Sequence, residues 1–166
     1  MKRAVFLGAM LAVVALLPLH LAPPIAASAT TFSFNLIGPN TAKATSGFLA
    51  GHTIRVTGSG TFNTGTRSIV ASGSFTDFKA DGSVFARGTW EATEFDSFTG
   101  FGGPNPGTQG GVLHMTITIF PNGGAPVTGR PMSVTCAIFA PAGTEEGITF
   151  GAFTEKTGGL TLFHLD

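Results

Sequence analysis

The sequence predicts an all-β protein, with about eight antiparallel strands in a meander that closes into a small barrel. Two observations support this. After residue 30, apolar residues alternate with small or polar ones, and no window has the apolar spacing of an amphipathic helix. Clusters of Gly, Asn, Asp and Pro separate these segments, where short hairpin turns would connect neighbouring strands. A sandwich of two sheets fits the same pattern and stays open as an alternative.

The expected strands follow one another along residues 30–166. Their apolar members, in chain order, are Phe32/Phe34/Leu36, Ile54/Val56, Ile69/Ala71, Trp90, Leu113/Met115/Ile117/Ile119, Val134/Cys136/Ile138, Ile148/Phe150 and the tail Leu160–Leu165. The longest interruption, Gly100–Gly111, is rich in Gly and Pro. We expect this segment to be a rigid surface turn, with a lid over a ligand as the alternative.

A weak repeat supports the meander. Ser59–Phe62, Ser72–Phe75 and Arg87–Trp90 each place a Gly two positions before a large ring. Such a Gly lets a neighbouring side chain cover the bare backbone, which suits strongly curved sheets. The predicted architecture resembles that of small secreted meander barrels such as lipocalins and avidins, but none of their signature motifs occurs here, so no family is assigned.

The first 29 residues have the features of a cleavable secretory signal peptide. Lys2 and Arg3 precede an apolar run, Ala4–Leu17, and residues 27–29 form a small-x-small cleavage site. The run is shorter than the roughly 20 residues that a membrane-spanning helix needs. We therefore expect residues 30–166 to form one exported domain, secreted or periplasmic, with no integral membrane association after cleavage.

The charge pattern argues against a nucleic-acid partner. The chain has nine Lys and Arg and nine Asp and Glu; without Lys2 and Arg3 the balance is seven against nine, a net charge of −2. Binding to nucleic acid requires a basic patch, and no Lys/Arg cluster is present. The oligomeric state is not indicated.

A single cysteine, Cys136, excludes an internal disulfide. It lies in phase with Val134 and Ile138, which favours a buried, small apolar side chain over a reactive thiol or an intermolecular disulfide. No His, Cys and acidic residues have the spacing of metal ligands, and no cofactor motif is found, so we expect neither metal nor cofactor.

The inward-facing positions of the predicted strands are unusually small. They include Gly58, Gly60, Ala71, Gly73, Ala86, Gly88 and Ala92. Either the Phe rings, 16 in the whole chain, fill the interior, or an apolar cavity is left for a ligand. Filling is slightly favoured, because cavities cost stability unless function maintains them.

Four residues are candidates for ligand binding: Trp90, Glu94, Asp96 and His114. Continuing the inward phase of Trp90 brings Glu94 and Asp96 to the interior, where two carboxylates could bind a polar group or act as acid and base. A β-bulge near residue 93 would instead place both acids in water, and is favoured because buried unpaired carboxylates are costly. His114 lies opposite the apolar face of its strand, which predicts a surface position; pairing with the two acids is the alternative.

Three functions remain open at this point. The leading hypothesis is a noncatalytic β-domain that binds a small, mainly apolar molecule in the barrel mouth or interior. The second is an enzyme of isomerase or cyclase type, for which Glu94, Asp96 or Arg87 must converge on one cavity. The third is an envelope or extracellular interaction module without a cavity, for which an exposed patch of Phe rings would be diagnostic.

Overall fold

The computed structural model describes residues 30–105 and 107–166, so the predicted signal peptide lies outside it. The described residues form eight strands and no helix: β1 (Thr31–Lys43), β2 (Thr53–Asn63), β3 (Ser68–Phe78), β4 (Val84–Asn105), β5 (Thr108–Pro121), β6 (Val127–Cys136), β7 (Gly147–Phe150) and β8 (Glu155–Leu165). Every strand pairing is antiparallel, and the all-β prediction is confirmed.

Within the described ranges, no helical segment is long and apolar enough to cross a membrane.

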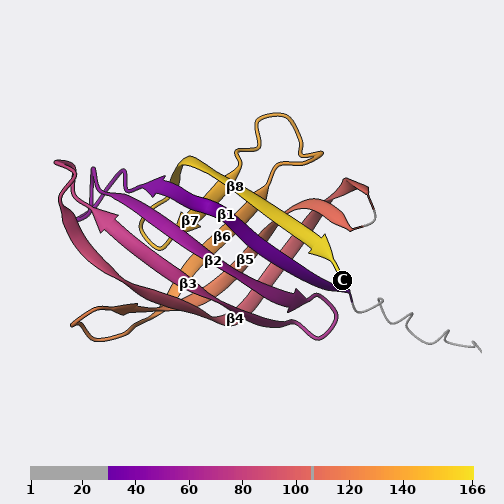
Figure 1. Cartoon of the computed structure of the whole chain (residues 1–166), viewed down its shortest axis with the longest axis horizontal. Helices are drawn as coiled ribbons and strands as arrows, with labels where there is room; N and C mark the ends of the chain where they lie inside the picture. Colours follow the sequence, from indigo (N-terminus) through magenta and orange to yellow (C-terminus); the bar gives the residue numbers. More distant parts are fainter. Residues whose placement is uncertain (1–29, 106) are drawn as a thin grey trace, which may run out of the picture.

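The eight strands belong to a single sheet that curls onto itself. Strands β1 to β7 pair in sequence order, and β8 pairs with β1 along most of its length. Strand β8 also pairs with β5 at Thr108 and Gln109, so hydrogen bonds form a closed ring through β1, β2, β3, β4, β5 and β8. The β6–β7 hairpin continues from β5 outside that ring. Figure 1 shows β1, β2 and β3 crossing in front of β5 and β6 in this barrel-like arrangement.

Phenylalanine rings fill one end of the interior. The cluster draws on β1, β2, β4 and β8, and its neighbouring ring centroids lie 4.8–6.0 Å apart. Its members are Phe32, Phe62, Phe95, Phe98 and Phe163. At this end, aromatic side chains occupy the space beside the small inward positions.

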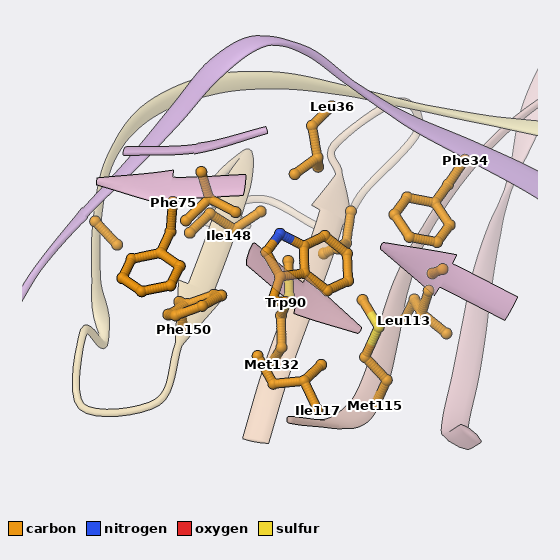
Figure 2. Close-up of a cluster of buried hydrophobic side chains, with 14 of the residues drawn as sticks. Phe34, Leu36, Phe75, Trp90, Leu113, Met115, Ile117, Met132, Ile148 and Phe150 are labelled. Carbon is orange, nitrogen blue, oxygen red and sulfur yellow. The ribbon is translucent and has the colours of Figure 1, made fainter. Parts of the chain in front are cut away.

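Trp90 occupies the middle of the interior and is 0% exposed. It lies opposite Gly73 on β3, which lies opposite Gly58 on β2. A Cβ on Gly58 would be 2.5 Å from the indole, and one on Gly73 would be 2.7 Å from the indole nitrogen, so only glycine leaves room for the ring. The indole N–H donates to the Thr57 carbonyl oxygen at 3.1 Å. Figure 2 shows Trp90 between Phe75 and Phe150 on one side and Phe34 and Leu113 on the other.

The segment Gly100–Gly111 differs from its expected structure. It is neither a surface turn nor a lid, since β4 runs to Asn105 and β5 starts at Thr108, with Gly100 opposite Gly111 in the ladder. Glycine permits this continuation, because a Cβ on Gly111 would lie 2.7 Å from the Phe98 ring. The Gly-rich composition therefore reflects close packing within a long hairpin.

Cys136 is fully buried on β6, as its phase predicted. Burial raises the pKa of its thiol. The side chain therefore serves as a small apolar core group.

Candidate functional site

The end of the barrel-like sheet opposite the phenylalanine cluster holds an open cavity of about 300 Å³. It is bounded by the β1–β2 loop, the ends of β2 to β7 and the turn before β8. Its apolar walls include Leu49, Phe75, Phe85, Ile119, Phe150 and Phe153. Two charged residues, Asp77 and Arg130, complete the lining. The open space therefore lies at this mouth, whereas the centre of the sheet is packed around Trp90.

Asp77 is a buried carboxyl on the cavity wall. It follows Phe75 on the inward face of β3 and is only 4% exposed. Its Oδ1 lies 3.0 Å from Nδ1 of His52, which is itself mostly buried. Because a buried carboxyl needs a partner, this contact accounts for one of its two oxygens.

The β1–β2 loop fixes the position of His52. Its backbone is closed by hydrogen bonds from the Gly51 N–H to the Ala44 carbonyl (2.8 Å) and from the Ala44 N–H to the His52 carbonyl (3.0 Å). The imidazole contacts the Phe85 ring edge-on, with centroids 5.0 Å apart. Phe48 is 89% exposed, and its ring centroid lies 6.2 Å from that of Phe85. Aromatic side chains thus form the rim of the cavity beside the His52–Asp77 pair.

A β-bulge places Phe85 at this rim. Asp77 pairs with Ala86, whereas Phe78 pairs with Val84, so Phe85 is the extra residue of β4. Bulges re-aim side chains in this way. Regular alternation would not have predicted that Phe85 and Ala86 both line the cavity.

The pKa of the Asp77 carboxyl is raised above its usual value, chiefly because burial disfavours the charged form; the hydrogen bond and charge of His52 act in the opposite direction. A raised pKa means that the folded state binds this proton more readily than the unfolded chain. The stability that the group contributes is therefore fully present below the unfolded pKa and is lost as the pH rises through the folded pKa.

We expect the substitution Asp77→Asn to remove this dependence. As the pH rises through the acidic range, from below the usual carboxyl pKa upward, the wild-type protein should lose stability relative to the variant, because only the wild type must ionise a buried carboxyl. Thermal unfolding of both proteins at several pH values measures the difference. A Tm difference that does not change over this range would contradict the raised pKa.

Arg130 lines the same cavity from β6. It continues the inward phase of Met132 and Val134 on β6, but beyond the packed interior, where it is exposed. Within the part of the chain that the structure describes, its guanidinium has no hydrogen-bond or ion-pair partner. It is therefore free to interact with solvent or with a bound molecule.

None of the four residues selected from the sequence lines this cavity. Trp90 is enclosed in the core. The register of β4 against β5 shifts between Ala92 and Glu94, which is the bulge that was the favoured alternative, so Phe95 is buried and Glu94 is exposed.

Asp96 and His114 lie on the outer face of the β4–β5 hairpin. Asp96 is half-buried and accepts hydrogen bonds from the Thr116 hydroxyl at 3.3 Å. His114 is exposed, as its phase predicted, and pairs in register with Ser97. Among the described residues, no hydrogen bond or ion pair joins His114 to Glu94 or Asp96.

The sequence did contain a signal for the two charged residues that line the cavity. Extending the inward phase of Ala71, Gly73 and Phe75 by two residues reaches Asp77, and extending that of Val134 back along β6 reaches Arg130. What the alternation could not reveal is that these two strand ends meet at one mouth, because that depends on how the sheet closes.

Comparison with protein-family models, with curated proteins and with solved structures finds no match for this chain. Among the described residues, no group of three or more His, Cys, Asp and Glu side chains is arranged to hold a metal ion.

Proposed function

We propose that the protein binds a small, mainly apolar molecule in the cavity at the open end of its barrel-like sheet. The observation that carries this proposal is an open space of about 300 Å³, walled mainly by aliphatic and aromatic side chains and containing one buried carboxyl. Ligand sites typically combine apolar walls with a few polar groups, in cavities of about 300–1,000 Å³.

The contrast between the two ends of the interior supports a functional reason for the cavity. Phe62 and its neighbours fill one end, whereas Phe75 and Phe150 leave the other end open. Unfilled apolar space costs stability, since the lining side chains lose contacts. A chain with so many Phe residues could fill this end as well, and a bound ligand explains why it does not.

The other two hypotheses have less support. The isomerase or cyclase required Glu94, Asp96 or Arg87 to converge on a cavity, and none of these lines the mouth. The exposed rings of Phe48 and Phe85 border the mouth, and we assign them to the binding site instead of to a separate interaction surface. Action outside the cytoplasm remains part of the proposal, on the strength of the signal-like residues 1–29.

A first test is native mass spectrometry of the protein, produced from the full-length chain in a host that exports it and purified without detergent. We expect a stoichiometric adduct of small mass, or, after its extraction, saturable binding of the neutral apolar fluorophore N-phenyl-1-naphthylamine. A protein that carries no adduct and binds no fluorophore would contradict the proposal.

A pair of variants locates the binding. Ala152 lines the cavity in the exposed turn before β8, so Ala152→Trp should obstruct the mouth and weaken fluorophore binding by at least about tenfold. Ala142→Trp adds the same side chain at an exposed position in the β6–β7 loop and should leave binding unchanged. Equal binding by both variants would place the fluorophore elsewhere.

A further inference from the structure

Asp77, which lines the cavity, uses only one of its two carboxyl oxygens in a hydrogen bond. His52 contacts Oδ1, and among the described residues Oδ2 has no hydrogen-bond partner. The side chain is almost fully buried, yet it belongs to the cavity lining. Oδ2 is not fully enclosed, since among the described residues only Oδ1 of Asn40 is a buried polar side-chain atom without a partner. A donor that enters the cavity can therefore reach Oδ2, and a carboxylate oxygen is a strong acceptor.

Aromatic rings line the same cavity as this acceptor. Phe75, Phe85, Phe150 and Phe153 line the same space, and the centroids of Phe75 and Phe150 are 5.7 Å apart. The faces of aromatic rings attract cations, and the attraction strengthens when water is excluded. Carboxylate and ring faces therefore favour the same class of ligand group.

Resting on the proposed function, we propose that the ligand is an organic amine: an apolar body that carries a protonated nitrogen, whose N–H donates to Oδ2 of Asp77. The apolar body would contact the rings and Leu49, and the ammonium group would give Oδ2 the partner that the described residues do not supply. Both features of the lining, its apolar walls and its buried acceptor, are then used by one molecule.

The alternative is an anionic ligand held by Arg130. This is less favoured because the Arg130 guanidinium is exposed and already solvated, whereas Asp77 is buried and lacks a second partner. Water and salt screen the repulsion between an exposed guanidinium and a bound cation. The more buried of the two charges therefore determines which ligand is preferred.

The test uses three probes with one common body: 3-phenylpropylamine, 3-phenylpropanol and 3-phenylpropionate. Each is titrated at neutral pH against the protein by calorimetry or by displacement of the neutral fluorophore. We expect the amine to bind at least about tenfold more tightly than the alcohol, and the carboxylate to bind most weakly. Arg130→Gln should tighten amine binding by about twofold to threefold, because it removes a like charge.

Asp77→Asn is the decisive variant. It should abolish the preference for the amine, so that the amine and the alcohol bind about equally well, while the affinity for the alcohol changes little. The control is Asp96→Asn, which makes the same change in a half-buried carboxyl outside the cavity and should keep the full preference.

The outcomes separate the two proposals. If the alcohol and the fluorophore bind but the amine has no advantage, or keeps it in Asp77→Asn, the amine proposal is wrong and the apolar site stands. Tighter binding of the carboxylate that is lost in Arg130→Gln would overturn it in favour of an anionic ligand. If no probe and no fluorophore binds, the proposed function fails as well.

Discussion

Replacing Trp90 with alanine is expected to lower the free energy of unfolding by about 3–5 kcal/mol. The indole is the largest fully buried side chain of the described residues, and it covers the bare backbone of Gly58 and Gly73 on two neighbouring strands. Its removal leaves a cavity that these glycines cannot fill, because they have no side chains to move. It also removes the donor to the Thr57 carbonyl.

Chemical denaturation followed by far-ultraviolet circular dichroism measures this change, since Trp90 is the only Trp and its loss removes the fluorescence signal. Trp90→Phe is the intermediate variant: it keeps an aromatic ring and loses part of the volume and the N–H, so it should cost less than alanine. Val70→Ala, at a position 77% exposed on β3, should change stability by less than about 0.5 kcal/mol. Equal losses for Trp90→Ala and Val70→Ala would show that the indole does not hold these strands together.

The strands and the direction of most side chains could be predicted from the alternation of apolar and polar residues, because successive side chains of a strand point to opposite faces of the sheet. Along β2, Ile54, Val56 and Phe62 are buried while Arg55 and Thr57 are exposed, as expected. The repeat predicted that a neighbouring side chain covers its glycines, and this holds for Gly73, which the Trp90 indole covers. Gly60 and Gly88 instead lie against Ala71 and the backbone of Phe120.

The location of the cavity could not be predicted in this way. Bulges after Ala92 and at Phe85 change which residues face inward, and a bulge depends on pairing with a partner strand and not on local sequence. The candidates Glu94 and Asp96 were selected by continuing a phase that the first of these bulges interrupts. Asp77 was overlooked because an isolated acid at a strand end is usually solvent-exposed.

Between β7 and β8, side-chain hydrogen bonds take the place of backbone pairing. Among the described residues, no ladder joins β7 to β8, although both border the interior. Glu146, just before β7, bridges this gap: its Oε2 accepts from the Ala137 N–H at 2.6 Å, and its Oε1 accepts from the Thr161 N–H at 2.7 Å. The Thr161 hydroxyl lies 2.8 Å from the same Oε1. One carboxylate thus connects the end of β6, the start of β7 and the middle of β8.

The substitution Glu146→Gln is therefore expected to destabilise the protein by about 2–4 kcal/mol, although it hardly changes the shape of the side chain. An amide has one oxygen and one NH₂ group, so whichever way it is turned, either Ala137 or Thr161 has a backbone N–H that faces another donor.

Denaturation measures the loss of stability in Glu146→Gln, and amide hydrogen exchange should show it first in β7. Glu155→Gln, an exposed change on β8, should have little effect. If Glu146→Gln is as stable as Glu155→Gln, other contacts must hold β7 against β8. The most evident of these is Lys156 on β8, whose Nζ donates to the carbonyl oxygen of Glu145, two residues before β7, at 2.8 Å. If exchange in β7 speeds up in Glu146→Gln while the phenylalanine cluster stays protected, the β6–β7 hairpin is the part of the fold that opens most easily. This hairpin supplies Arg130 and Phe150 to the mouth of the cavity, so Glu146 then holds that side of the mouth in place.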